Sequence, residues 1–549
     1  MARPASKYLI PVGSAAVVYY SANYYYQSRN KDTSSGGSFT IPVKTRSTDG
    51  RSVITKDNPI TRLSQAEIER KLTSHAVSYS IPRAGERRGR WRYETASVAS
   101  NAPIEDAHAE MIVRPGEAGA QALLGSPNSG DTKRNTAAGQ PLAGDMLFFA
   151  IMDGHSGYNT SRLLAKTLIP SVALELSTLS SSPVATQDAQ GWLSYLKSYM
   201  PFNTKYSSSS LTSYPFASDP KYVSTAIQTA FANLDSNIVN APIQHVNALQ
   251  GPPFDRESEA YHLAVANLLP ALSGSCALLA VLDQAREDLY VACTGDSRAV
   301  AGYQVPALQG TKWEADDLSV DQTGRSPSEL KRVQSEHPTS ESSAVIRSGR
   351  ILGSLEPTRA FGDARYKWTK EFQERLVPLF NVPDSGVPTR IRAPPDDLRT
   401  PPYVTSRPEV THRKVSFSQT ADVSSSSTPP LRFVVMATDG LWDKLSSAAV
   451  VELVGGYLDR SSSPSSLPHP TPSTDGDGWT YSDTNVATHL IRNALTGNAL
   501  TKRPESWGLS ELMSIPAPYS RRYRDDITVT VVWWEDDDEP KTQIAKAKL

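Results

Sequence analysis

The stretch MLFFAIMDGHSG, residues 146–157, decides the fold that we predict for this chain. Its apolar run predicts a buried strand, and the run ends on Asp153, Gly154 and His155. A turn at this point exposes the carboxylate of Asp153, and the glycine lets a ligand approach the backbone carbonyl closely. Hard divalent cations prefer oxygen ligands of these two kinds. The stretch therefore predicts a strand that delivers Asp153 and Gly154 to a metal site, with His155 beside them to donate a proton.

The same pattern, an acidic residue at the end of an apolar run, recurs in distant parts of the chain. The further acidic blocks are NAPIEDAHAE (101–110) with Glu105 and Asp106, TGDSRAV (294–300) with Asp296, ATDGLWD (437–443) with Asp439 and Asp443, and RRYRDDITVTVVW (521–533) with Asp525 and Asp526. Any single block is more simply explained as an acidic residue that caps a turn or a helix. Five blocks in one chain favour a shared site, since one loop seldom supplies enough oxygen ligands for a divalent cation. The sequence therefore predicts metal-assisted chemistry on a phosphate or a similar anion.

Composition limits the classes of function. The chain has 549 residues, with 56 Lys and Arg against 57 Asp and Glu, which argues against a nucleic-acid partner. Hydrophobic residues make up 39%, enough for a core, while 40 prolines indicate polar insertions in one large domain. The two cysteines, Cys276 and Cys293, lie in apolar runs and are predicted to be buried, reduced thiols. Their number excludes a disulfide scaffold and zinc held by cysteines.

Local signals place strands in neighbouring pairs, with helices between them at irregular intervals. Capping and stop signals predict helices over residues 65–73, from Pro327 to about Glu336, and from Ser446 or Ser447 to the glycine pair at 455–456. The apolar runs Ala277–Leu282 and Leu289–Thr294 predict a hairpin. This arrangement favours an α+β fold over a doubly wound parallel sheet.

Polar segments interrupt these elements, and we expect most of them to be surface insertions. They are rich in Ser, Pro, Gly, Thr or Asp and cover residues 114–143, 177–190, 203–220, 383–402, 418–430 and 460–478. The alternative, that some of them form ordered caps over the site, stays open.

The N-terminal segment differs in composition from the rest. No acidic residue precedes Asp32, and the tyrosine-rich stretch YLIPVGSAAVVYYSANYYY, residues 8–26, lies between basic residues. This pattern predicts a mitochondrial targeting segment over residues 1–31, and residues 8–26 are also a candidate for association with the inner membrane. A secretory signal anchor and a disordered tail are the alternatives. We expect a flexible linker over residues 32–60, a catalytic domain over 61–536 and a C-terminal tail over 537–549.

In order and wording, these blocks resemble the metal-dependent protein serine/threonine phosphatases of the 2C type. The matching stretches are IEDAHAE, FFAIMDGHSG, SGSCALLAVL, LYVACTGDSRAV, LGSLEPTRAFGD, FVVMATDGLWD and RRYRDDITV. The resemblance implies a sandwich of two antiparallel sheets flanked by helices, in α-β-β-α layers. It also implies hydrolysis of phosphoserine and phosphothreonine through a metal-activated water, with two Mg²⁺ or Mn²⁺ ions and a weaker third ion.

The resemblance further implies a role for each residue. Asp153 would bridge two ions, and Gly154 would offer its carbonyl to one of them. The other implied ligands are Asp439 and Asp525 for the first ion, Glu105 for the second, and Asp296 and Asp443 for the third, with Asp106 supporting the ligand shell. His155 would be the general acid. Arg359 and Asp363, in the stretch TRAFGD, would brace the site.

The stretch NAPIED resembles one branch of that family, the pyruvate dehydrogenase phosphatases and their mitochondrial relatives. Most members carry a phosphate-binding arginine where this chain has Asn101, which becomes the candidate phosphate-binding residue. Arg90 and Arg92 are alternative phosphate ligands, although a simpler reading makes both of them solvated surface charges. The branch implies a mitochondrial location, in the matrix or the intermembrane space. It also implies a phosphoprotein substrate, the phosphorylated E1 subunit of the pyruvate dehydrogenase complex.

Other classes of function fit the sequence less well. A pseudophosphatase that only binds phosphoproteins as a scaffold would show lost ligands, and here all the core carboxylates are present. A cysteine-dependent phosphatase is disfavoured because neither cysteine lies in a phosphate-binding loop. A nucleotide-binding or kinase-like enzyme is disfavoured because the sequence contains no P-loop.

Overall fold

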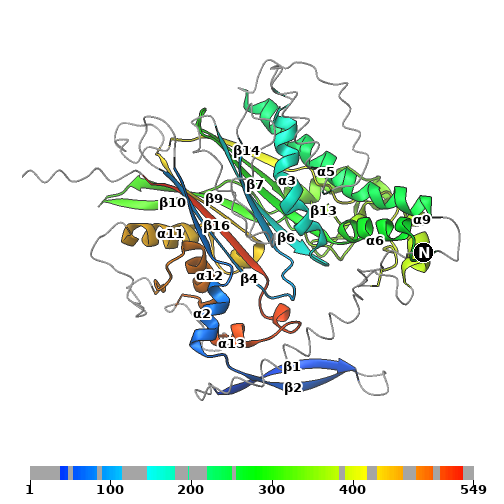
Figure 1. The fold of residues 1–549 in the computed structure, drawn as a ribbon, viewed down its shortest axis with the longest axis horizontal. Helices are drawn as coiled ribbons and strands as arrows, with labels where there is room; N and C mark the ends of the chain where they lie inside the picture. The colour runs from blue at the N-terminus through cyan, green and yellow to red at the C-terminus, as the bar shows by residue number, and fades with distance from the viewer. Residues whose placement is uncertain are drawn as a thin grey trace, which may run out of the picture.

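The computed structural model describes residues 37–46, 53–82, 90–113, 145–177, 219–249, 255–308, 310–381, 390–416, 429–461, 478–498 and 507–535, together with residues 179, 196 and 199. Within these residues, two large antiparallel sheets lie face to face, and helices cover both outer faces (Figure 1). The predicted α+β sandwich in α-β-β-α layers is therefore confirmed.

The chain order of the strands differs from their order in the two sheets. The first sheet has the order β10-β9-β15-β16-β4-β3, with β3 (Val77–Pro82), β4 (Arg90–Val98), β9 (Arg298–Pro306), β10 (Thr311–Asp317), β15 (Leu431–Ala437) and β16 (Ile527–Glu535). The second has the order β14-β8-β7-β6-β5, with β5 (Ala107–Val113), β6 (Met146–His155), β7 (Gly274–Asp283), β8 (Asp288–Thr294) and β14 (Glu409–Lys414); β13 (Phe361–Gly362) also pairs with β7. The last of these strands, β16, lies inside the first sheet, between β15 and β4.

Alternation along β6 explains why its apolar run is continuous. Leu147 and Ile151 pack in the core between the two sheets. Phe148 and Met152 face the opposite way, into the core beneath the helices. Because both faces of the strand are covered, every side chain from Leu147 to Met152 is apolar and buried. The covering helices are α3 (Asn159–Ser177), α5 (Pro220–Ala248) and α6 (Glu259–Leu272).

Other helices cover the outer face of the first sheet. They are α2 (Gln65–Thr73), α11 (Ser447–Ser461) and α12 (Val486–Thr496). The predicted helix over residues 65–73 is confirmed, and so is the one from Pro327, which is α7 (Pro327–Ser335). The predicted stop of α11 at the glycine pair was wrong. A Cβ at Gly455 would lie 2.2 Å from the ring of Trp313, so this glycine lets the helix approach the sheet closely.

An N-terminal hairpin precedes the sandwich. The strands β1 (Ser38–Arg46) and β2 (Val53–Thr61) pair antiparallel, and the side chains of Ile41, Val43 and Ile60 pack on Ile515. The prediction of a flexible linker over residues 32–60 was therefore wrong where the hairpin forms. Most residues of β2 are exposed, so its composition resembles that of a linker, and a few alternating apolar side chains hold the hairpin in place.

Some predictions fall on other parts of the chain. Residues 1–36 and 537–549 lie outside the described residues, and with them the predicted targeting segment and tail. No helix within the described ranges combines the length and the apolar character needed to cross a bilayer. Most of the predicted insertions also lie outside the described residues. Of residues 383–402, the part from residue 390 is described, and it buries Ile391 and Leu398 in two of the hydrophobic cores.

Candidate metal centre

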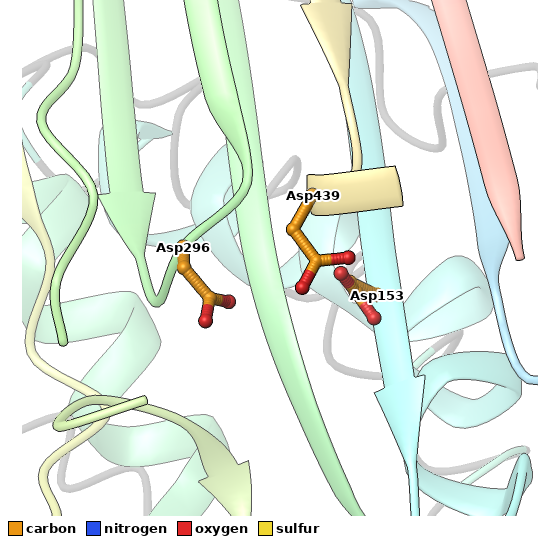
Figure 2. A group of neighbouring side chains, drawn as sticks. All are labelled: Asp153, Asp296 and Asp439. Atoms are coloured by element: carbon orange, nitrogen blue, oxygen red, sulfur yellow. The ribbon is translucent and has the colours of Figure 1, made fainter. Parts of the chain in front are cut away.

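Three carboxylates meet where strands of both sheets end. Asp153 belongs to β6, Asp296 follows β8, and Asp439 begins the short helix α10 (Asp439–Trp442) directly after β15. One carboxylate oxygen from each residue lies within 4.8 Å of those of the other two. Figure 2 shows the three side chains converging from separate segments. The fold thus brings together three of the acidic residues that were predicted to bind metal.

These three carboxylates repel one another. Burial raises the pKa of Asp153 and of Asp439, and repulsion by neighbouring carboxylates raises both pKa values further. Burial likewise raises the pKa of Asp296. A bound divalent cation would remove this repulsion. Because the group offers only oxygen atoms, it fits the Mg²⁺ or Mn²⁺ predicted from the sequence.

Asp525 lies beside this group, two residues before β16, and pairs with an arginine. Its charge raises the pKa of Asp153 and of Asp439. Its carboxylate forms an ion pair with Arg521, which belongs to the 3-10 helix η3 (Ser520–Arg522). Burial lowers the pKa of Arg521, but the negative charges of Asp525, Asp439 and Asp153 raise it by more. Arg521 was not among the predicted site residues, because its contact with Asp525 depends on the turn of η3.

Glu105 and Asp106 flank the centre in the loop before β5. Glu105 accepts a hydrogen bond from the backbone N–H of Gly157 at 2.7 Å, and burial raises its pKa. Asp106 is buried more deeply and accepts a hydrogen bond from the hydroxyl of Thr438 at 3.0 Å. Burial, with repulsion from neighbouring carboxylates, raises the pKa of Asp106. Glu105 thus keeps an open side, while Asp106 lies behind the centre as a support.

The two remaining predicted ligands, Gly154 and Asp443, differ in their surroundings. A Cβ at Gly154 would lie 2.1 Å from the backbone carbonyl oxygen of Glu105, so only glycine lets this loop pack on β6. Packing is therefore one reason for a glycine at this position. The sequence had suggested another reason, the access of a cation to the backbone carbonyl. Asp443 is exposed and lies one helical turn beyond Asp439, whose pKa it raises. It stands outside the group of three converging carboxylates.

Asp526 binds Asn101, the residue that was predicted to bind phosphate. Asp526 accepts hydrogen bonds from the backbone N–H groups of Asn101 and Glu105, each at 2.9 Å. The side-chain nitrogen of Asn101 donates to Asp526 at 2.9 Å and to Glu105 at 3.5 Å. Because both acceptors are carboxylates, the amide N–H groups are not free for an anion. Asn101 therefore holds the loop in place, and phosphate binding by Asn101 stays a prediction that these contacts do not favour.

Arg90 and Arg92, the alternative phosphate ligands, lie far from the centre. They lie toward the start of β4, whose other end leads to Asn101, so about 20 Å of extended strand separates them from the centre. Both arginines pair with Glu535, at 3.0 Å and 3.2 Å. These contacts favour the simpler of the two interpretations, in which both arginines are surface charges.

His155 is held by Asp363. The Nε2 atom of His155 lies 2.6 Å from Oδ2 of Asp363, which is buried and directly follows β13. Gly274 permits this contact, since a Cβ there would lie 2.1 Å from His155 Nε2 and 2.4 Å from Asp363 Oδ2. Burial lowers the pKa of His155, but the charge and the hydrogen bond of Asp363 raise it by more. Asp363 thus braces the site through His155.

Arg359 lies in a separate, buried network. It forms ion pairs with Glu329 at 2.6 Å and with Glu409 at 2.9 Å, while Arg332 pairs with Glu329 at 2.7 Å. Burial would raise the pKa of Glu329, but hydrogen bonds from Arg359, Arg332 and Thr358 lower it to about 2. The network ties α7 to the segment that leads into Asp363, so Arg359 has the bracing position expected of it.

Both cysteines are free and buried, as predicted. Cys276 lies opposite Asp153 in the pairing of β6 with β7, and its thiol donates a hydrogen bond to Oδ1 of Asp296 at 3.1 Å. Burial and the nearby charges of Asp296 and Asp153 raise the pKa of Cys276. The thiol therefore stays protonated and serves as a donor to one carboxylate of the centre.

Comparisons with known proteins found similarity to one family. The sequence profile of the family described as "Protein phosphatase 2C" matches residues 216–496. A protein phosphatase 2C homolog of Schizosaccharomyces pombe is 37% identical over 455 residues, which cover 82% of this chain and 81% of that protein. The mitochondrial pyruvate dehydrogenase (acetyl-transferring) phosphatase 1 of Saccharomyces cerevisiae is 33% identical, over 88% of this chain and 75% of that protein. The protein of the same name in Homo sapiens is 31% identical, over 70% of this chain and 72% of that protein.

Proposed function

Because the chain belongs to the protein phosphatase 2C family and is a protein serine/threonine phosphatase, we propose that it dephosphorylates the E1 subunit of pyruvate dehydrogenase in mitochondria. The observation that carries the reaction is the group of Asp153, Asp296 and Asp439, whose oxygens lie within 4.8 Å of one another. The proposed substrate is supported by the names of two relatives and by the stretch NAPIED.

The carboxylates at the strand ends would hold the metal. The family depends in general on Mg²⁺ or Mn²⁺. When bound, these ions would supply a water of lowered pKa and would neutralise negative charge on the phosphate oxygens. We propose two ions, held by Asp153 with Gly154, Asp439, Asp525 and Glu105, and a weaker third ion at Asp296 and Asp443.

His155 would act on the leaving group. The bond from phosphorus to the serine or threonine oxygen breaks while a bond to the oxygen of water forms, which yields the free hydroxyl and inorganic phosphate. His155 would donate the proton that the leaving oxygen takes up. Because Asp363 engages Nε2, the ring nitrogen left for this transfer is Nδ1. No side chain needs to form a bond to phosphorus, in line with the protonated state of Cys276.

The reaction can be tested without the natural substrate. Turnover of p-nitrophenyl phosphate should require added Mg²⁺ or Mn²⁺, stop in excess EDTA and return when metal is restored. A scaffold that only binds phosphoproteins would show no metal-dependent turnover, which separates the pseudophosphatase alternative from the proposal. Full turnover in EDTA by protein that is shown to be free of bound metal would contradict the proposal.

The substrate needs its own experiment. Pyruvate dehydrogenase complex phosphorylated on E1 should be compared with phosphorylated casein, at equal concentrations of phosphorylated sites. We expect kcat/KM to be at least about 10-fold higher for E1, because a specific substrate contributes contacts beyond its phosphate group. Equal values for the two phosphoproteins would remove E1 as the preferred substrate while leaving the phosphatase assignment intact.

Location is tested by cell fractionation. We propose that residues 1–31 direct the chain to mitochondria, because they are basic and free of acidic residues. The full chain should co-sediment with mitochondria and resist added protease, and a chain lacking residues 1–31 should stay in the cytosol. Both chains would carry the same C-terminal reporter. Import of the shortened chain into mitochondria would show that the targeting signal lies outside residues 1–31.

A further inference from the structure

We propose that Arg521 binds the phosphate group of the substrate beside the metal centre. The inference rests on the proposed function, because it assumes that a phosphate group is attacked over Asp153 and Asp439. It assigns a ligand-binding role to a residue that the sequence did not single out, and it answers the question left open when Asn101 proved to be engaged elsewhere.

The position of Arg521 is fixed by its ion pair. Residue 521 lies four positions before Asp525, and the turn of η3 brings the guanidinium onto the carboxylate of Asp525. The charges of Asp439 and Asp153 also raise the pKa of Arg521, so the guanidinium lies in the electrostatic field of the converging carboxylates. Its side chain is 49% exposed, against 20% for Asp525. The Arg521 side chain therefore contacts a carboxylate beside the centre and is also accessible to a ligand from solvent.

The chemistry of a guanidinium suits this place. Arginine carries five N–H donors in a planar fork that matches the oxygens of phosphate, and the ion pair with Asp525 engages only part of that fork. A phosphorylated side chain brings a charge of about −1.5 to −2, which must be compensated beside several carboxylates. A divalent ion bound by Asp525 would compete with Arg521 for the same oxygens. Loading of the centre would therefore turn the guanidinium from the carboxylate toward the phosphate.

Three other described arginines lack this combination of charge, access and place. Arg524 is 7% exposed, and its Nε donates to the backbone carbonyl of Leu512 at 3.2 Å. Arg90 and Arg92 pair with Glu535 at the far end of β4. Arg521 thus remains as the exposed arginine that contacts a carboxylate of the centre.

The chain offers a matched control in the next residue. Arg522 belongs to the same turn of η3 and is exposed. The test compares R521Q, R521K and R522Q with the unchanged protein, at one Mn²⁺ concentration and one ionic strength. Two quantities are measured: the inhibition constant of inorganic phosphate against p-nitrophenyl phosphate turnover, and the dissociation constant of phosphate from the Mn²⁺-loaded protein by calorimetry.

We expect R521Q to weaken phosphate binding by about 10- to 100-fold in both measurements, because a charge-assisted pair of hydrogen bonds is lost. R521K should lose less affinity for phosphate, since lysine keeps the positive charge but lacks the planar set of N–H donors of a guanidinium. R522Q should stay within about twofold, as expected of a surface charge. If R521Q does not fold, judged by circular dichroism, R521K still decides the question.

Two results would overturn the proposal. In the first, phosphate binds R521Q and R521K as tightly as the unchanged protein, while calorimetry shows altered Mn²⁺ affinity; Arg521 would then be only the partner of Asp525. In the second, R522Q weakens phosphate binding as much as R521Q, so that general surface charge is responsible. Failure of the proposed function looks different, because the unchanged protein would then lack Mn²⁺-dependent turnover, and calorimetry would still report on Arg521.

Discussion

The imidazole of His155 and the carboxylate of Asp363 are joined by a 2.6 Å hydrogen bond, although 208 residues separate them in the chain. Asp363 follows Gly362, and both have left-handed backbone, with φ of 47° and 66°. The N–H of Gly362 donates to Asp235 at 2.9 Å, and Lys367 pairs with the other oxygen of Asp235 at 2.7 Å. The orientation of His155 is thus set by a buried chain of contacts that reaches back to α5.

We predict that Asp363→Asn slows hydrolysis of a phosphothreonine peptide by about 10-fold or more, which is part of the roughly 10²- to 10⁴-fold that a positioned proton donor contributes. Hydrolysis of p-nitrophenyl phosphate should change little, because nitrophenolate leaves without help from an acid. Steady-state kcat for the two substrates at saturating Mn²⁺ checks this selectivity. The double variant with His155→Ala should be no slower than His155→Ala alone, since Asp363 acts through the imidazole.

A second histidine–carboxylate pair provides the control. His108 and Glu110 lie 2.7 Å apart, and both side chains are buried. Glu110→Gln removes a carboxylate from a histidine in the same sheet, outside the catalytic machinery. It should lower stability and leave the ratio of the two kcat values unchanged. A shift of that ratio equal to the one in Asp363→Asn would assign the effect to general loosening of the sandwich.

We predict that Asp153→Asn abolishes metal-dependent turnover and raises the melting temperature of the metal-free protein. Burial and repulsion by other carboxylates raise the pKa of Asp153, so ionising this group costs folding free energy. The amide removes the charge with little change in volume. Calorimetry in EDTA at neutral pH checks the stability, and Mn²⁺ titration checks the metal. A variant with normal turnover at saturating Mn²⁺ would show that the centre lies elsewhere.

The sign of the pH effect follows from the same shift. A carboxyl group whose folded pKa is raised above the ordinary value of 3.8 favours folding most below that value. This contribution is lost as the pH rises through the raised pKa. The stability gained by Asp153→Asn in EDTA should therefore grow from acid to neutral pH. In saturating Mn²⁺, the unchanged protein should instead be more stable than the variant.

We predict the opposite dependence at Glu329. Hydrogen bonds from Arg359 and Arg332 outweigh burial and lower its pKa from 4.5 to about 2. The stabilisation is then present above pH 4.5 and is lost as the pH falls through about 2. Glu329→Gln should cost about 3 kcal/mol at pH 7, because it leaves buried guanidinium groups without their partner. Urea unfolding should be measured for the variant and the unchanged protein at pH 7 and at pH 3. The difference between their free energies of unfolding should be smaller at pH 3.

We predict that deletion of residues 1–61 lowers the free energy of unfolding by about 3 kcal/mol or more, whereas deletion of residues 1–36 does not. The longer deletion removes three buried side chains of the hairpin and uncovers Ile515. It also removes the packing of Phe39 on Trp507, whose ring contacts Tyr523 near Asp525. The longer deletion should therefore also raise the Mn²⁺ concentration needed for half-maximal turnover. Equal stability of both shortened chains would mean that the hairpin contributes little.

Local patterns predicted the α+β fold and the carboxylates that converge at the strand ends, whereas the two-sheet sandwich was implied by the family resemblance. A strand covered on both faces has a continuous apolar run, and its ligands come directly after the last buried residue, as at Asp153 and Asp439. The sequence could not assign Asn101, because its partner Asp526 lies 425 residues away. Arg521 was missed for a different reason, which is its dependence on a local turn. Its partner is only four residues away, but the pairing exists only if residues 520–522 turn as a 3-10 helix.

The central position of β16 has a consequence for the timing of activity. The loop that carries Glu105 is held by Asp526, which is 421 residues further along the chain. A ribosome adds about 5–20 residues per second, so roughly 20–80 s pass between the synthesis of these two residues. Throughout that interval the first carboxylates exist without the strand that positions them. A nascent or prematurely ended chain therefore carries no assembled centre, and phosphatase activity begins only after β16 has been made and inserted between β15 and β4.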